Sequence, residues 1–268
     1  MKAKYDQIGI NYNLTRKADK YLTEQLLYHL QPTKNEKYLD IGCGTGNYTS
    51  EFQKKGFDFI GIDPSEIMLE KAKLKNHKIH WQIGSAENTG LPENFVKGII
   101  GSLTIHHWTN LTKGFTELNK VLKPNGRIVI FTSTPEQMQG YWLNHYFPKM
   151  LSDSMIQMPT LEKVKKAMND SGIELMETQK YFIKPDLEDQ FLYCGKQNPE
   201  LYFDEQIRHG ISSFSSLSNR TEVENGLSEL RKDIDSGKIK EIIKSYENDL
   251  GDYLYVIGKK TVGNHGFK

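Results

Sequence analysis

Residues 38–50 read YLDIGCGTGNYTS, an apolar stretch followed by glycines at positions 42, 44 and 46. Glycine adopts positive φ angles freely and lets a bound molecule approach the backbone closely. The flanking residues predict a strand at 37–41 and a helix at 45–56. We therefore predict that this loop follows a strand, opens a helix and wraps a ligand at the carboxyl end of the sheet.

Six further segments are expected to be strands because apolar and β-branched residues concentrate in them between turn residues. They are residues 57–63, 78–84, 96–103, 126–133, 173–183 and 252–260. Helices are predicted at residues 17–30, 64–75, 110–123 and 160–172. Pro64 is expected in the first turn of its helix. This alternation predicts an α/β, doubly wound, mostly parallel sheet of seven strands with helices on both faces.

The second half of the chain is less regular, since residues 135–158 show no clear period and residues 186–250 interrupt the alternation. We expect the chain to have four parts. Residues 1–32 form an N-terminal helical cap, 33–185 plus 251–260 the cofactor-binding core, 186–250 a helical insertion that serves as a substrate lid, and 261–268 a disordered tail.

Composition excludes several classes of protein. The chain has 268 residues, with 35 basic and 34 acidic side chains and a net charge of +1, which argues against a surface built for nucleic acid. No secretory signal and no run of about 18 apolar residues is present, so we expect a cytoplasmic protein without a membrane span. Cys194, His145 and His209 fit no standard ligand spacing, so no metal is expected.

Two acidic residues indicate the chemistry of the ligand. Asp63 ends the next predicted strand, 17 residues after Gly46, where an acid typically accepts hydrogen bonds from ribose hydroxyls. The loop reads D-x-G-x-G-x-G from Asp40, whereas a dinucleotide fingerprint reads G-x-G-x-x-G. The Asp40 charge disfavours a diphosphate and suits a cation such as an ammonium or a sulfonium.

Together these motifs resemble the class I S-adenosylmethionine-dependent methyltransferases, in the broad type 11 group that includes small-molecule methyltransferases. LDIGCGTG (39–46) is similar to the family's first motif, FIGIDPSEIMLEKAK (59–73) to the second and GSAENTGLP (84–92) to the third. IIGSLTIHHW (99–108) resembles the family's fourth strand, and KPNGRIVI (123–130) resembles the turn and strand beyond the next helix. The resemblance implies a Rossmann-like fold, the cofactor S-adenosylmethionine and in-line transfer of its methyl group to a small-molecule acceptor.

The resemblance also implies which residues bind the cofactor. In chain order they are Tyr12, Arg16, Asp40, Gly42, Gly44, Gly46, Asp63, Pro64, Met68, Ser85, Ala86, Glu87 and Ser102. The first two would cap the cofactor carboxylate, and Asp63 would hold the ribose with Pro64 and Met68 beside the adenine. Ser85 stands where many relatives carry an acid that meets the adenine amino group. Ser102 would border the transferable methyl group.

The acceptor is expected beyond the fourth strand, where His106 and His107 lie. A histidine there can take a proton from a hydroxyl, thiol or amine, because imidazole titrates near neutrality. The alternatives are that the two side chains only line the pocket, or that they pack on Trp108 and cap the next helix.

An aromatic run comes after the fifth predicted strand. Its candidate acceptor-binding residues are Tyr141, Trp142, His145 and Tyr146. Such side chains can frame a flat acceptor or a cation, but they can equally form the packing face of a helix.

Other functions remain open at this point. An NAD-dependent oxidoreductase is disfavoured by the glycine spacing. A tRNA, rRNA or protein methyltransferase, or a cofactor-binding protein without turnover, is an alternative to small-molecule methylation. The motifs do not specify the acceptor, the methylated atom or the oligomeric state.

Overall fold

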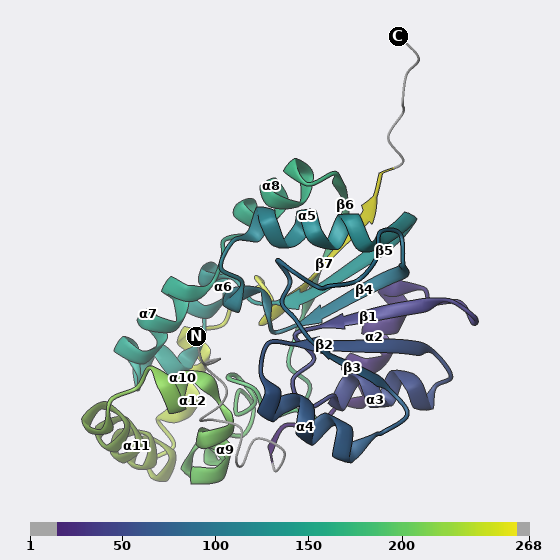
Figure 1. Ribbon diagram of the computed structural model, residues 1–268. Coiled ribbons are helices and arrows are strands. Elements are labelled where there is room, and N and C mark those ends of the chain that lie inside the picture. Colours follow the sequence, from purple (N-terminus) through teal and green to yellow (C-terminus); the bar gives the residue numbers. More distant parts are fainter. Residues whose placement is uncertain (1–14, 262–268) are drawn as a thin grey trace.

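A seven-stranded sheet forms the centre of the computed structural model, which describes residues 15–261 (Figure 1). The strand order is β3-β2-β1-β4-β5-β7-β6. The strands are β1 (Lys37–Ile41), β2 (Asp58–Asp63), β3 (His80–Ile83), β4 (Val96–Ser102), β5 (Leu122–Thr132), β6 (Ile173–Tyr181) and β7 (Tyr253–Lys260). The first five pair in parallel, whereas β7 runs antiparallel between β5 and β6. The predicted Rossmann-like α/β fold is thus confirmed.

Helices cover both faces of the sheet because its central strands are apolar on both sides, as is typical of buried parallel strands. The α-helices are α2 (Lys20–Leu30), α3 (Asn47–Lys54), α4 (Glu66–Lys75), α5 (Leu111–Val121), α6 (Pro135–Gln139), α7 (Pro148–Gln157), α8 (Leu161–Asp170), α9 (Glu205–Gly210), α10 (Ser212–Ser216), α11 (Arg220–Asp235) and α12 (Ile239–Ser245). The 3₁₀ helices are η3 (Ile105–His107), η4 (Trp142–His145) and η5 (Pro199–Phe203). Apolar side chains of α2 and α3 pack on one face, and those of α5 and α8 pack on the other.

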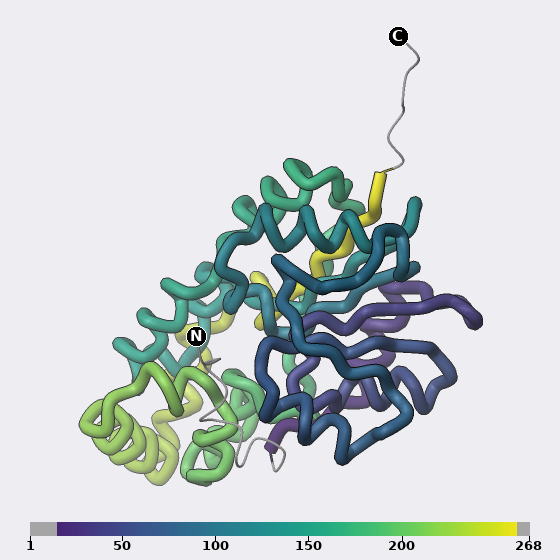
Figure 2. Tube along the Cα trace, in the orientation of Figure 1, coloured from purple at the N-terminus to yellow at the C-terminus, as the bar shows by residue number. Residues whose placement is uncertain are grey.

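Six of the helices after β5, namely α6, α7 and α9–α12, gather at the end of the sheet to which the carboxyl ends of β1, β2 and β4 point, whereas α8 lies beside α5 (Figures 1 and 2). Here α6, α7 and α9–α12 share one apolar core with the sheet, which includes the fully buried Trp142, Phe147 and Tyr202. This helical region therefore lies where ligands bind in open α/β sheets. The division of the chain into a core and a lid stays a prediction.

Two local predictions are wrong, namely the start of the helix at Pro64 and the start of the fifth strand. Pro64 precedes the helix rather than opening it, because the Ser65 side chain accepts a hydrogen bond from the Met68 backbone at 3.3 Å and caps α4. Residues 135–158, for which the sequence predicts no element, form α6, η4 and α7, and these helices of 5, 4 and 10 residues are too short to give a sustained period. Strand β5 begins at Leu122, before the predicted turn, because Leu122 pairs with Val96 across a register shift.

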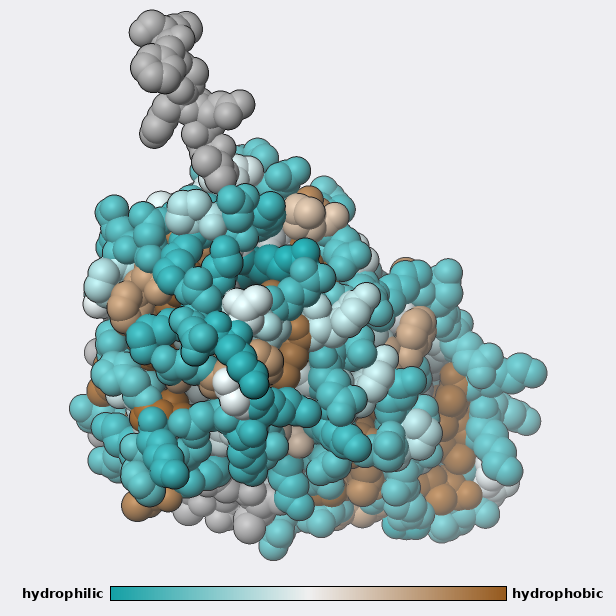
Figure 3. Space-filling view, turned by 90° about the vertical axis from the view of Figure 1, so that its right-hand side faces the viewer, coloured by the Kyte–Doolittle hydropathy of each residue, from teal (hydrophilic) through white to brown (hydrophobic). Residues whose placement is uncertain are grey.

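Residues 1–14 and 262–268, which include Tyr12 and all but the first residue of the predicted tail, lie outside the described residues. Within the described part of the chain, no helix is both long and apolar enough to cross a membrane. The face in Figure 3 is largely hydrophilic, with hydrophobic residues in small patches among polar ones.

Candidate functional site

The glycine loop has the backbone conformation that its sequence requires. Gly42, Gly44 and Gly46 have φ angles of +70°, +54° and +69°, which residues other than glycine rarely adopt. A Cβ on Gly42 would lie 2.0 Å from the Thr104 hydroxyl, and one on Gly46 would lie 2.2 Å from the Trp81 ring. A Cβ on Gly44 would meet no atom within 4 Å. The outer glycines therefore allow close packing, and the middle one leaves a cradle open.

Asp40 places a buried carboxyl group beside this cradle. The residue is 4% exposed, and its carboxyl accepts a hydrogen bond from the Thr49 hydroxyl at 2.5 Å. Burial raises the pKa of the Asp40 carboxyl to about 7; the Thr49 hydrogen bond opposes this rise and the Asp63 charge adds to it. A cation in the cradle would favour the ionised form, so the site suits the positive group expected from the sequence.

Asp63 holds the loop in place. Its carboxylate accepts hydrogen bonds from the backbone N–H of Gly44 at 2.8 Å and of Ser65 at 2.9 Å. Of the two residues expected beside the adenine, Pro64 is exposed and Met68 is buried. The ribose and adenine roles of these residues stay predictions.

The residues of the third motif make hydrogen bonds and packing contacts within the protein. Ser85 and Asn88 exchange two backbone hydrogen bonds, and Ala86 is buried in the core. The Glu87 carboxylate accepts hydrogen bonds from the Thr109 backbone at 2.6 Å and from the Asn110 backbone at 3.2 Å, at the start of α5. Burial alone would raise the pKa of Glu87, but these hydrogen bonds outweigh it and lower the pKa. Glu87 thus anchors α5, a role that the sequence did not suggest.

A polar cavity lies over the glycine loop. Its lining consists of Arg16, Asp40, Gly42, Cys43, Gly44, Thr45, Asn47, Tyr48, Ser102 and Asp189. Five of the predicted cofactor residues meet there, namely Arg16, Asp40, Gly42, Gly44 and Ser102. The other predicted residues within the described chain lie outside this lining.

A second cavity of about 90 Å³ adjoins the first and shares Arg16 with it. The remaining lining residues are Leu103, His106, Ser133, Met138, Tyr141, Ser154, Gln157, Met158, Phe191, Leu192, Ile211, Ser212, Ser213, Leu217 and Tyr253. Ser102 of the first cavity and Leu103 of the second are consecutive residues at the end of β4. Leu103 has a φ angle of +51°, a conformation unusual for a leucine and often found at functional sites.

The two histidines differ in position. Their rings lie against each other with centroids 3.9 Å apart, but only His106 lines the second cavity. Trp108 packs edge-on against Phe115 of α5, at 5.1 Å between ring centroids. Of the pair, His106 is therefore the side chain that lies at the second cavity.

The aromatic run is divided between several environments. Tyr141 lines the second cavity, whereas the Trp142 indole donates a hydrogen bond to the Lys196 carbonyl at 3.1 Å in the core. His145 is exposed, and the buried Tyr146 donates its hydroxyl to Asp233 at 3.0 Å. The structure thus brings only Tyr141 of these four side chains to the cavity.

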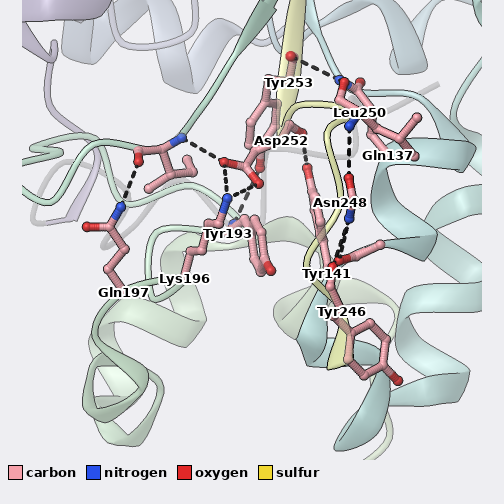
Figure 4. Close-up of polar contacts among 12 residues, drawn as sticks. Gln137, Tyr141, Tyr193, Lys196, Gln197, Tyr246, Asn248, Leu250, Asp252 and Tyr253 are labelled. Atoms are coloured by element: carbon pink, nitrogen blue, oxygen red, sulfur yellow. Dashed lines mark hydrogen bonds and ion pairs between the residues drawn. The ribbon is translucent and has the colours of Figure 1, made fainter. Parts of the chain in front are cut away.

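Asp252 organises the wall behind Tyr141 (Figure 4). Its carbonyl accepts hydrogen bonds from the hydroxyls of Tyr141 and Ser133. Its carboxylate accepts two hydrogen bonds from Lys196, at 2.7 and 2.8 Å, and one from the Ile183 backbone. Sequence reasoning missed Asp252, Ser133 and Asp189, because none of them belongs to a motif and their partners are remote in the chain.

Comparisons with known proteins agree with this geometry. A family model described as "Methyltransferase domain" matches residues 39–130. A crystal structure of a putative methyltransferase from an antibiotic biosynthesis pathway of Anabaena variabilis is 32% identical, with a TM-score of 0.81, and covers 92% of this chain and 99% of that one. The chain therefore belongs to the class I S-adenosylmethionine-dependent methyltransferases, and S-adenosylmethionine is the cofactor.

Curated relatives match a smaller part of the chain. A demethylmenaquinone methyltransferase of Staphylococcus saprophyticus is 26% identical over 203 residues, which cover 66% of this chain and 86% of that protein. An uncharacterised methyltransferase of Mycobacterium tuberculosis is 28% identical over 112 residues, 42% of this chain. The match spans less than half of that relative, 46% of its length.

Proposed function

We propose that this protein transfers the methyl group of S-adenosylmethionine to a small molecule bound in the cavity beside His106. The observation that carries the proposal is the junction of the two cavities at Arg16 and at the end of β4. A cofactor in the first cavity and an acceptor in the second would meet there.

The residues present fit this cofactor. The cradle over Gly44 gives room beside a backbone that no side chain shields, and the buried Asp40 favours a positive group. Arg16 supplies a guanidinium that suits a carboxylate. When bound, the cofactor supplies an electrophilic methyl group on a sulfonium. The protein's part is to align the acceptor with it and to exclude water.

The lining of the second cavity supports an uncharged, largely apolar and flat acceptor. Tyr141, Phe191 and Tyr253 provide aromatic surface, and Met138 and Met158 provide flexible apolar surface. No carboxylate lines this cavity among residues 15–261, so a protonated amine would lose hydration without a countercharge. Because one relative is named demethylmenaquinone methyltransferase, hydroxylated quinones and phenols are the first acceptors to test.

The proposal is tested with S-adenosylmethionine that carries a labelled methyl group. The purified protein is incubated with hydroxynaphthoquinones, simple phenols and small amines, and in parallel with total tRNA and a protein extract. Labelled small-molecule product is expected from the quinones or phenols. Label found only in tRNA or protein would contradict the proposal, and so would cofactor binding without transfer to any small molecule.

His106 is proposed to accept the proton of a hydroxyl acceptor. Its replacement in His106→Ala is expected to lower kcat by about 100-fold, a usual size for the loss of a general base, while cofactor affinity changes little. His107→Ala is the matched comparison, since the two rings are adjacent but His107 does not line the cavity. An equal or larger loss in His107→Ala would refute the assignment to His106.

A further inference from the structure

Asp189 places a buried carboxylate in the first, polar cavity, which we call the cofactor cavity from here on. This residue belongs to none of the sequence motifs. Its side chain is 2% exposed and accepts hydrogen bonds from Arg16 Nε at 2.5 Å and from Arg16 Nη2 at 3.2 Å. The Tyr48 hydroxyl donates a third, at 3.0 Å. These charge-assisted bonds, two of them from one planar guanidinium, fix the orientation of the Arg16 side chain.

The three side chains come from parts of the chain that are remote in sequence. Tyr48 lies in α3, directly after the glycine loop, Arg16 precedes α2, and Asp189 lies between β6 and η5. The residues on either side of Asp189 are also held. The Glu188 backbone donates to the Asp19 carboxylate at 3.1 Å, and the Gln190 backbone donates to the Thr15 carbonyl at 3.1 Å. Asp189 is thus held rigidly against the N-terminal segment.

The position of Arg16 makes this pair relevant to methyl transfer. Arg16 lines both cavities, so its charge lies at the proposed meeting point of cofactor and acceptor. A guanidinium without a partner would repel a nearby sulfonium, and in a buried site such a repulsion is larger than in water. The Asp189 carboxylate offsets this charge.

We propose that Asp189 is a positioning residue of the methyl-transfer site. It holds the Arg16 guanidinium between the two cavities, neutralises its charge toward the cofactor sulfonium and ties α3 to the segment after β6. The proposal rests on the proposed function only in placing the acceptor next to Arg16. Its test uses the cofactor alone, so a failure to find a small-molecule acceptor would leave the result interpretable.

The test compares S-adenosylmethionine with its demethylated product, S-adenosylhomocysteine, because the two differ in the sulfonium charge. Calorimetric titration of Asp189→Asn is expected to show binding of S-adenosylmethionine weakened by about tenfold and binding of the neutral product by about threefold or less. A residue with a merely structural role would weaken both ligands equally. Asp189→Glu, which keeps the charge, is expected to restore most of the preference.

Two further variants keep the proposal falsifiable. The double variant Arg16→Gln with Asp189→Asn removes both charges and is expected to return the ratio of the two affinities toward the wild-type value, even if Asp189→Asn alone does not fold. Asp252→Asn is the matched control, because Asp252 is another buried carboxylate, paired with Lys196 at 2.7 Å outside the cofactor cavity. The control is expected to lower the thermal midpoint without changing the ratio. An unchanged ratio in Asp189→Asn, or an equal change in Asp252→Asn, would overturn the proposal.

Discussion

Asp40 is expected to favour cofactor binding at the expense of the stability of the fold. Its carboxyl group is buried beside the glycine cradle, and its pKa in the folded protein is about 7, against 3.8 for an ordinary aspartate. Because the folded-state pKa is raised, the unliganded fold favours the protonated form. The stability of the unliganded protein is therefore expected to fall as pH rises from about 4 to above 7.

The variant Asp40→Asn is predicted to separate these two effects. It removes a buried charge and keeps an oxygen that can accept the Thr49 hydrogen bond, so the free energy of unfolding at pH 8 should rise by roughly 1 to 4 kcal/mol. Affinity for S-adenosylmethionine should fall, because the cation loses its countercharge. Urea unfolding and calorimetry measure the two quantities. A variant that is less stable than the wild type at pH 8 would contradict the prediction.

His29 is expected to make the protein less stable as the pH falls. The side chain is buried against Tyr255, with ring centroids 4.8 Å apart, and burial lowers its pKa although Glu177 acts in the opposite direction. A lowered folded-state pKa means that the unfolded chain takes up the proton more readily. Stability from this group is present above pH 6.5 and is lost as pH falls below it, at up to about 1.4 kcal/mol per pH unit.

His29→Phe is expected to flatten the dependence of unfolding free energy on pH between 7 and 5, because phenylalanine keeps the aromatic contact without the titration. Chemical unfolding at several pH values measures the slope. His80→Phe, at an exposed position, serves as the control. Equal slopes in the wild type and in His29→Phe would show that His29 does not cause the acid sensitivity.

At the scale of elements, the glycine loop depends on β2 and β3. A Cβ on Gly61 of β2 would lie 2.3 Å from the Trp81 ring of β3, and the same ring lies under Gly46. The Trp81 indole is held by a hydrogen bond to the Asn76 carbonyl at 2.8 Å, so the ring cannot easily move away. The packing of the Trp81 ring against Gly61 and Gly46 thus fixes the position of the loop relative to β2 and β3.

Gly61→Ala is therefore predicted to lower the free energy of unfolding by about 1 to 3 kcal/mol through overpacking. The same change made in a Trp81→Leu background should cost much less, because the smaller side chain leaves room for the methyl group. A double-mutant cycle by urea unfolding measures this coupling. Additive effects of the two substitutions would contradict the contact.

The sequence was most informative where local rules determine the structure. The strands, the helices that alternate with them and the glycine loop could be predicted from hydrophobic periodicity and from residues such as Gly44 that require a special backbone conformation. Pro64 was misplaced because a better capping residue, Ser65, comes directly after it. Residues 135–158 carry no usable pattern, because they form three short helices of 5, 4 and 10 residues rather than one long one.

At the scale of the whole molecule, the second cavity, where we propose that the acceptor binds, could not be predicted in the same way. Its wall joins residues from the ends of β4 and β5 with α7, α10 and the start of β7. Contacts such as Ser133 with the Asp252 carbonyl, 119 residues apart, leave no local signal in the sequence. The same applies to Arg16 and Asp189, which lie 173 residues apart.

The insertion of β7 between β5 and β6 has a consequence for synthesis of the chain. The ribosome releases β7 after all the other strands, so until then β5 and β6 both expose unpaired edges that favour aggregation. Tyr253, which lines the second cavity, and Asp252, whose carbonyl accepts hydrogen bonds from Tyr141 and Ser133, emerge at the same late stage. A premature stop codon just before residue 252 would leave every residue of the glycine loop in place. It would remove the strand that joins β6 to the rest of the sheet, together with Tyr253 of the second cavity.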